Sequence, residues 1–164
     1  MRLRARPAKE SDCMLIFSWI TDHRVRTMSL NQDQSTLEAY TEEFERIVRQ
    51  QKTHVLIIEQ YEDSGNWIPI AHVQVDEDGE ITMSLACEDC AQHLGAAVIK
   101  TGIAYIRRYP SIEKLVAHMK CDNVACVKAF EGAGFRLASE PTPSGHQYLE
   151  YTFTIPHRTF GLFY

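Results

Sequence analysis

The sequence predicts a single α/β (α+β) domain, residues 1–164, with a mixed, mostly antiparallel central sheet flanked by helices. Two runs of alternating apolar and polar residues, 67–75 and 80–87, flank a DEDG turn, which is typical of a β-hairpin. Stretches with apolar residues every three or four positions precede and follow this hairpin, which indicates helices on both sides of it in the chain. The expected order of elements is β-α-α-β-β-β-α-β-α-β-β.

One strand and two helices are expected before the hairpin. Residues 3–6 can form the strand, and Ser11 and Asp12 can cap a helix that carries Leu15, Ile16, Trp19 and Ile20 at helical spacing. The pattern at 35–38 resembles a capping box. It precedes an apolar stripe formed by Leu37, Tyr40, Phe44, Ile47 and Val48, which predicts the second helix.

Three consecutive strands are expected next, at 54–60, 67–75 and 80–87. Because side chains alternate between the two faces of a strand, the second strand should place Ala71, Val73 and Val75 opposite His72 and Gln74. The third strand should place Ile81, Met83, Leu85 and Cys87 on one face and Thr82, Ser84 and Ala86 on the other.

The C-terminal half predicts two helices, a strand and a final hairpin. A largely buried helix should run from about Gln92 to Arg108 and end before Pro110, because the residue before a proline avoids helical conformation. A strand at 112–119 follows. Asp122 can cap the next helix, and Gly134 can end it. Residues 135–138 and 148–154 can pair across the PTPSG loop.

Charge and hydropathy exclude several classes of protein. The net charge is -5, which argues against broad nucleic-acid binding. No run of about 18 apolar residues appears, so we expect no membrane-spanning segment. The charged N-terminal stretch MRLRARPAKESD lacks the apolar segment of a secretory signal, so we expect a cytoplasmic protein.

The five cysteines, at 13, 87, 90, 121 and 126, are expected to be reduced. Cys87 and Cys90 form a C-x-x-C pair, and Cys121 and Cys126 form a looser pair with four residues between them; together they offer the four sulfur ligands that zinc prefers. No glycine-rich knuckle surrounds either pair. We therefore expect no metal and read these cysteines as small buried apolar side chains.

Small residues mark the helix that follows the third strand. Gly95, Ala96 and Ala97 fall in its expected first turn. A helix N-terminus has unpaired N–H groups and partial positive charge, so small side chains there leave room for a phosphate group. They also let a helix pack closely on its neighbours. The residues alone leave both interpretations open.

Two linked patterns resemble the GNAT superfamily of N-acetyltransferases. The pattern Q-x-x-G-x-A, here Gln92-His93-Leu94-Gly95-Ala96-Ala97, follows a strand and opens a long helix, as does that superfamily's acetyl-CoA motif. Further along, an N-x-x-A pattern begins at Asn123 and leads into an aromatic-E-x-x-G-F block at 130–135, which is similar to its second signature. The resemblance covers nearly the whole chain and implies a GNAT-like fold and acetyl-CoA as co-substrate.

The resemblance also implies a set of cofactor-binding residues. The amides of Gln92, His93, Leu94, Gly95, Ala96 and Ala97 would hold the CoA pyrophosphate. The strand end at Leu85, Ala86 and Cys87 would pair with the pantetheine arm as an added strand does. Asn123 would contact the pantetheine or order the site, and Phe130 would pack near the thioester. Three positions depart from the pattern: His93 and Ala97 replace common glycines, and Phe130 stands where many members have a tyrosine acid.

The implied reaction is direct attack of an amine on the acetyl thioester. An alkylamine has a pKa near 10.4, so a positioned base helps, whereas a thiol with a pKa near 8.5 leaves as thiolate without much help. His72, which titrates near neutral pH, is the first candidate base. Glu80 could act through water, and Ser84 could relay a proton or orient the reactants. Each has an ordinary alternative: a half-buried histidine, a solvated glutamate and a polar strand face.

The acceptor is expected to be a small primary amine. Residues 19–26 resemble a W-x-N-D-x-x-V-R pattern of a subgroup that includes amino-sugar, ribosomal-protein and antibiotic acetyltransferases. A nucleotide-linked amino sugar is the first expectation, and Arg24 and Arg26 could contact its phosphate. A protein N-terminus or ribosomal protein, and a CoA-binding module without catalysis, are the alternatives. The apolar C-terminal segment 155–164 can pack on the domain or on a second subunit, which would give a homodimer.

Overall fold

The computed structural model describes residues 1–30, 35–86 and 88–156, with the backbone alone at 88–93. Its helices and strands follow the predicted order with one additional short helix. The elements are β1 (Leu3–Pro7), a 3-10 turn (Glu10–Asp12), α1 (Cys13–Ile20), α2 (His23–Met28), α3 (Leu37–Gln50), β2 (His54–Tyr61), β3 (Trp67–Val75), β4 (Ile81–Leu85), α4 (Glu88–Ile106), β5 (Lys114–Met119), α5 (Val124–Ala133), β6 (Arg136–Ser139) and β7 (Leu149–Thr154).

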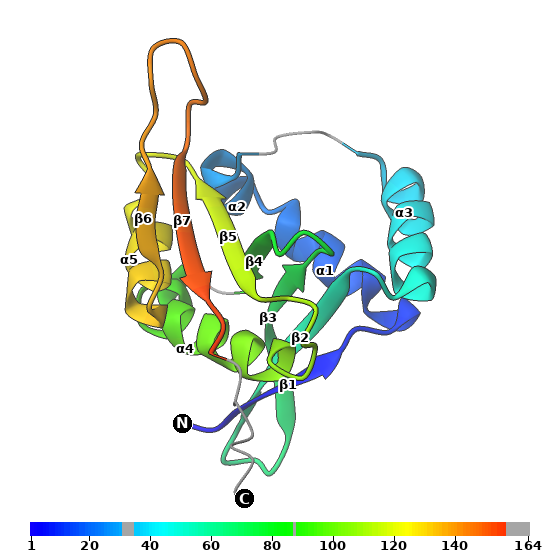
Figure 1. Cartoon of the computed structure of the whole chain (residues 1–164). Helices are drawn as coiled ribbons and strands as arrows, with labels where there is room; N and C mark the ends of the chain where they lie inside the picture. The colour runs from blue at the N-terminus through cyan, green and yellow to red at the C-terminus, as the bar shows by residue number, and fades with distance from the viewer. Residues whose placement is uncertain (31–34, 87, 157–164) are drawn as a thin grey trace, which may run out of the picture.

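The strands form two antiparallel sheets that meet at one point. The first sheet has the order β1-β2-β3-β4 and the second β5-β7-β6. A single parallel bridge, Glu80 to Val116, joins the start of β4 to β5, and Figure 1 shows the two strands side by side. Gly79 makes this close approach feasible, because its φ is +86° and a Cβ there would overlap the carbonyl oxygen of Lys114.

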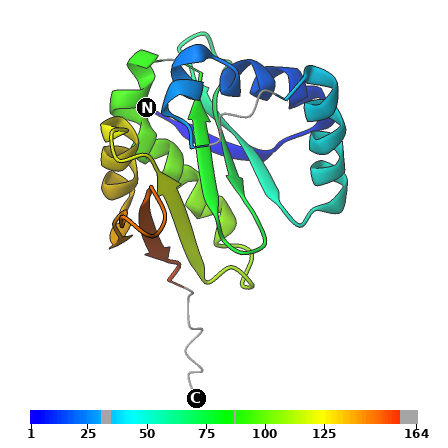
Figure 2. The same ribbon diagram turned by 90° about the horizontal axis from the view of Figure 1, so that it is seen from above.

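Helices cover both faces of the first sheet, as Figure 2 shows from above. The larger core lies between the sheets and α4 with α5; Val73, Ile81, Ile99 and Phe130 belong to it. The smaller core lies on the opposite face, where α1 and α3 contribute Ile16, Trp19 and Phe44. The alternation predicted for β3 and β4 is confirmed, since Ala71, Val73 and Val75 are fully buried in the larger core while His72 faces the other way.

An ion-pair network ties the first turn of the chain to the sheet. Glu59 accepts hydrogen bonds from Arg4 at 2.6 Å and Arg6 at 2.8 Å, and Arg6 also holds both carboxylate oxygens of Asp12. Burial opposes the charge on Asp12 and Glu59, but these hydrogen bonds lower the pKa of both carboxyls. Asp12 is the N-cap residue of α1, as expected, but its side chain accepts the backbone N–H of Lys9 and makes no capping bond to α1.

The other differences from prediction lie at helix ends. α2 was not expected. Thr36, not Ser35, caps α3, and Asn123, not Asp122, caps α5, in each case by accepting a backbone N–H. α4 begins at Glu88, one turn before the predicted start. Cys87 and residues 157–164 lie outside the described residues, so the predicted roles of Cys87 and of most of the C-terminal segment are not addressed. No helix in the described part of the chain is both long and apolar enough to cross a membrane.

Candidate active site

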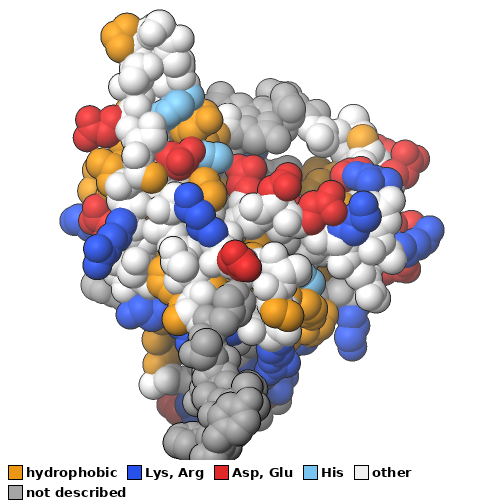
Figure 3. Space-filling model, viewed as in Figure 1, with side chains coloured by type: hydrophobic (Ala, Val, Ile, Leu, Met, Phe, Trp, Pro, Cys, Tyr) orange, Lys and Arg blue, Asp and Glu red, His pale blue; other side chains and the backbone are white. Residues whose placement is uncertain are grey.

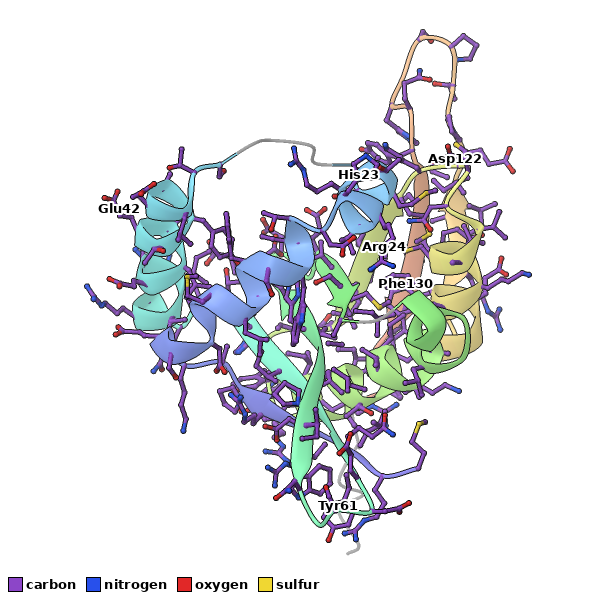
Figure 4. The ribbon with its side chains drawn as sticks, turned by 180° about the vertical axis from the view of Figure 1, so that it is seen from behind. His23, Arg24, Glu42, Tyr61, Asp122 and Phe130 are labelled. Atoms are coloured by element: carbon purple, nitrogen blue, oxygen red, sulfur yellow. The ribbon has the colours of Figure 1, made fainter. Side chains whose placement is uncertain are left out.

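A cavity of about 860 Å³ opens where β4 and β5 diverge beyond the Glu80–Val116 bridge. Its floor is the polar face of β3 and β4, with His72, Gln74, Thr82 and Ser84. Its sides come from the C-terminal part of α1, from α2, from the end of β5 and from the start of α5. Arg24 of α2 and Phe130 of α5 both line it, and Figure 4 shows the two side chains close together in the view from behind.

His72 and Ser84 form a buried polar pair on the floor of this cavity. They are register partners on β3 and β4, and the Ser84 hydroxyl lies 2.6 Å from His72 Nδ1. The two residues are 6% and 5% exposed, and burial lowers the pKa of His72 to about 4. His72 is therefore neutral at physiological pH and binds protons far more weakly than an ordinary histidine.

Glu80 is bound to a histidine that the sequence analysis did not single out. His118 of β5 lies between two carboxylates, with Nδ1 3.0 Å from Glu80 and Nε2 3.2 Å from Glu150. Burial disfavours the imidazolium, but the hydrogen bonds to both glutamates raise the pKa of His118. Figure 3 shows acidic and histidine side chains next to each other below the projecting β6–β7 hairpin. Glu80 thus takes part in a charged cluster that links the two sheets.

The strand pattern contained the signal that would have found His118. In the run 114–119, Leu115, Ala117 and Met119 are buried in the core, so His118 must face the same side as Val116 and its bridge partner Glu80. The contribution of Glu150 depends on the register of β5 with β7, where His118 and Glu150 are partners. Sequence periodicity does not specify that register.

Asn123 and Phe130 both line the cavity from α5. Asn123 Oδ1 accepts the backbone N–H of Cys126 at 3.1 Å, and its amide nitrogen donates to the carbonyl oxygen of Met28 at 3.2 Å. Phe130 is 2% exposed and packs edge-on against Phe135 with ring centroids 4.9 Å apart. Asn123 therefore joins the start of α5 to the end of α2, and position 130 supplies no hydroxyl.

The small residues of α4 face α5. A Cβ on Gly95 would lie 2.7 Å from Cβ of Ala129, and a Cβ on Gly132 would lie 3.1 Å from Cβ of Ala96. The packing interpretation of these residues is thus supported. Leu94, Gly95, Ala96 and Ala97 are not among the described residues that line the cavity, and no side-chain position is described for Gln92 and His93.

Because α4 starts earlier than expected, its unpaired N–H groups belong to earlier residues than predicted. The first four N–H groups of a helix have no acceptor within it. Because α4 starts at Glu88, these groups belong to residues 88–91, and the amides of 92–97 lie inside the helix. Pyrophosphate binding by the amides of 92–97 remains a prediction.

The free edge of β4 is the second feature suited to a cofactor. β4 is the last strand of its sheet in the described structure, and its only pairing beyond β3 is the bridge at Glu80. Leu85 and Ala86 lie at its open end and line the cavity, while Ala86 N–H donates to Ile70 on the β3 side. An extended chain with amide groups can therefore add to this edge.

α2 brings both arginines to the rim of the cavity. Arg24 donates to the Asp22 carboxylate at 3.0 Å and 3.1 Å, and this hydrogen bond lowers the pKa of Asp22 to about 2. Arg26 also lines the cavity. Trp19 is 8% exposed and belongs to the smaller core, as expected for a structural tryptophan.

The cysteines of the described residues form no metal site. Cys121 is exposed, and Cys126 is half-buried with a pKa raised to about 11 by burial. No group of three or more histidine, cysteine or acidic residues within the described residues could hold a metal ion. The pairing of Cys87 with Cys90 cannot be placed, because Cys87 and the side chain of Cys90 lie outside what is described.

Comparison with solved structures shows the same fold in several acetyltransferases. The aminoglycoside acetyltransferase AAC(6')-Ib, in complex with coenzyme A and kanamycin, has a TM-score of 0.73 and 18% identity, covering 93% of this chain and 95% of that one. Spermidine N-acetyltransferase from Vibrio cholerae, with CoA and spermine, has a TM-score of 0.75 and 14% identity over 93% and 95%. Ribosomal-protein-S5-alanine acetyltransferase from Vibrio fischeri has a TM-score of 0.72 and 12% identity over 94% of each chain.

Sequence comparison identifies the family. No curated protein sequence matches the chain. The family described as the acetyltransferase (GNAT) domain matches residues 2–136, which is most of the chain, and the fold expected from the resemblance is confirmed. The chain belongs to the GNAT acetyltransferases, enzymes that use acetyl-CoA.

Proposed function

We propose that this chain transfers the acetyl group of acetyl-CoA to a primary amine in the cavity between β4 and β5, and that the acceptor is a nucleotide-linked amino sugar. One observation carries this proposal: a single cavity reaches from the free edge of β4 to the polar face beneath α2. The first region suits an extended amide chain, and the second suits a polar acceptor.

The donor would enter from the side of α4 and α5. Its pantetheine arm would add to β4 at Leu85 and Ala86, and its pyrophosphate would lie at the N-terminal turn of α4. The attraction of a helix N-terminus for an anion is electrostatic and is screened by salt, so we expect a salt-dependent affinity for acetyl-CoA.

The amine nitrogen would attack the thioester carbonyl carbon, and the tetrahedral intermediate would then expel the CoA thiolate as the nitrogen loses its proton. Phe130 can donate no proton to the thiolate, and a thiolate with an ordinary pKa leaves without one. Ser84 would hold His72 on the floor of the site. Its low pKa makes His72 a poor acceptor for the proton of an ammonium ion, so we assign His72 a hydrogen-bonding role.

Glu80 is the remaining candidate for proton removal. Its side chain is 47% exposed and lines the cavity, so a water molecule can lie between it and the acceptor. His118 Nδ1 lies 3.0 Å from Glu80 Oε1 and orients the carboxylate at the edge of the cavity.

The charges around the cavity support two kinds of acceptor. Arg24 and Arg26 favour a phosphate-bearing sugar. Glu80 and Asp122 favour a cationic acceptor such as a protein N-terminus. Neither charge clearly outnumbers the other, so acceptor chemistry has to be measured.

The test is an acetylation assay with a panel of four amines: a nucleotide-linked amino sugar, kanamycin, spermine and a peptide that begins with alanine. Turnover of the amino sugar that exceeds the other three would support the proposal, and Arg26→Gln should then raise the KM for that acceptor alone. Faster turnover of the peptide would favour the second acceptor class. No turnover of any primary amine would refute the proposed reaction.

A further inference from the structure

The short helix α2 is stabilised at its ends. It has six residues, none of them buried. A helix of this length is unstable alone, and here it has no apolar face packed on the core to compensate. At its N-terminus the Asp22 carboxylate accepts the backbone N–H of Arg24 at 2.9 Å. The C-terminal carbonyls of a helix need hydrogen-bond donors from elsewhere.

Two of those carbonyls are bound by residues from the opposite side of the cavity. Lys120 Nζ donates to the carbonyl oxygen of Thr27 at 2.8 Å, and Asn123 Nδ2 donates to that of Met28 at 3.2 Å. A lysine ammonium at this end also interacts favourably with the helix dipole. Lys120 and Asn123 follow β5, and Figure 1 shows α2 next to the end of that strand.

Asn123 uses both ends of its amide. The oxygen caps α5 through Cys126 N–H, and the nitrogen holds α2. An aspartate at this position would keep the first contact and lose the second. This difference makes the two roles separable by mutation.

We propose that Lys120 and Asn123 are positioning residues for acceptor binding: together they hold α2 across the cavity, and α2 forms its outer wall. Arg24, Val25, Arg26 and Met28 of α2 all line the cavity, so release of its C-terminal end would move that wall away from β4. This inference rests on the proposed acceptor site for its effect on catalysis. The hold on α2 itself is inferred from the two hydrogen bonds and does not depend on the reaction.

The test compares Lys120→Met, Asn123→Asp and the double variant with two controls. Lys120→Met keeps the length of the side chain and removes its donors. Asn123→Asp keeps the cap of α5, so the melting temperature should stay close to that of the wild type. Lys128→Met makes the same charge change at an exposed position of α5, and Asn66→Asp makes the same chemical change in the exposed β2–β3 turn.

The first readout is the rate at which trypsin cleaves the unliganded, native protein after Arg24 and Arg26, identified by mass spectrometry. Cleavage follows the population of opened α2 when opening is fast, and one hydrogen bond changes that population by about fivefold. Each single variant should therefore be cleaved about five times faster than the wild type, and the double variant about 25 times faster if the bonds act independently. Both controls should match the wild type.

The second readout is steady-state kinetics with the best acceptor of the four-amine panel. Lys120→Met should show a raised KM for the amine, with kcat and the KM for acetyl-CoA within about twofold of the wild type. Unchanged cleavage in the double variant would overturn the hold on α2. Faster cleavage with an unchanged KM for the amine would overturn the role in acceptor binding. Absence of turnover with every amine would refute the proposed function, and the cleavage rates would still decide whether Lys120 and Asn123 hold α2.

Discussion

Gly95→Ala on α4, combined with Ala129→Gly on α5, tests why glycine occupies position 95. In Gly95→Ala the new Cβ would lie 2.7 Å from Cβ of Ala129, whereas carbon atoms in contact are ordinarily about 3.5–4.0 Å apart. Both atoms are attached directly to helix backbones, so rotation of a side chain cannot relieve the overlap. The helices must separate, or the contact must stay strained.

The size of the effect follows from two opposing contributions. Alanine in place of glycine stabilises a helix by about 1 kcal/mol, and overpacking costs about 1–3 kcal/mol, so Gly95→Ala should destabilise the protein by about 1 kcal/mol. Ala129→Gly should cost about 2 kcal/mol, from about 1 for helix propensity and about 0.8 for the lost buried methyl. The double variant moves one methyl across the interface and exchanges one glycine between helices. Its free energy of unfolding should lie within about 0.5 kcal/mol of the wild type, a coupling of roughly 2–3 kcal/mol.

Urea denaturation of the four proteins measures this coupling, provided that their m values agree. Ala133→Gly is the matched control. Ala133 is 6% exposed, close to the 7% of Ala129, but it is not among the atoms nearest to a Cβ at position 95. Its combination with Gly95→Ala should be additive. If the Gly95→Ala and Ala129→Gly effects also add, close packing on α5 is not the reason for glycine at 95.

The same variants separate packing from cofactor binding. A side chain at position 95 would point toward α5, so a methyl group there would not cover the N-terminus of α4. The double variant should bind acetyl-CoA within about twofold of the wild type, since the affinity depends on the amides of the first turn. A large loss of affinity in a fully stable double variant would show that the donor contacts position 95 directly.

Three further predictions concern the titratable groups. The pKa of folded His118 is raised, so its contribution to stability is complete below about pH 6.5 and is lost as the pH rises through the folded value. The difference in free energy of unfolding between the wild type and His118→Gln should therefore shrink by about 0.5–1 kcal/mol from pH 6 to 9. A difference that grows would contradict the ion pairs. Glu59→Gln should lower the free energy of unfolding by about 1–2 kcal/mol at pH 7, a value kept small because Arg4 is 49% exposed. The loss should disappear as acid protonates the wild-type carboxylate below its lowered pKa. A loss that persists at low pH would assign the effect to packing. A plot of the logarithm of kcat/KM against pH should show no inflection from His72 near pH 6.5, and His72→Gln should keep the shape of this plot. An inflection near pH 6.5 that the variant abolishes would restore His72 as the general base.

Local patterns predicted the parts of the fold that repeat along the chain. The alternation in 67–75 and 80–87 was sufficient to place His72 and Ser84 on one face, and the structure makes them register partners. Two adjacent cap-forming residues, Asp122 and Asn123, could not be ranked from sequence, because the choice depends on the path of the preceding turn. α2 escaped prediction because six residues without a buried face carry no periodic signal.

The contacts between distant segments were beyond such patterns. Glu80, His118 and Glu150 meet because a bridge joins β4 to β5 and a strand register joins β5 to β7. Lys120 contacts Thr27, a residue 93 positions earlier in the chain. Which neighbouring element a side chain at position 95 would face depends on the rotation of α4 about its axis. These features decide the charge and shape of the cavity, so acceptor specificity is the property least accessible from sequence.

Among the described residues the cavity offers only weak proton acceptors, which bears on which amine reacts fastest. His72 is neutral with a lowered pKa, Glu80 would act only through a water molecule, and Phe130 has no proton to exchange. An alkylamine with a pKa near 10.4 is neutral in about one molecule in 2,500 at pH 7, a cost of roughly 4.6 kcal/mol, whereas an α-amino group with a pKa near 8 costs about 1.4 kcal/mol. If the protein removes the proton inefficiently, this difference of about 3.2 kcal/mol should appear in kcat/KM as a preference of about 200-fold for the less basic amine. Raising the pH to 9 should reduce that preference about tenfold, because the neutral fraction of the alkylamine rises about 100-fold and that of the α-amino group only about tenfold. A preference that is independent of pH would mean that contacts with the acceptor, and not its ionisation, decide specificity.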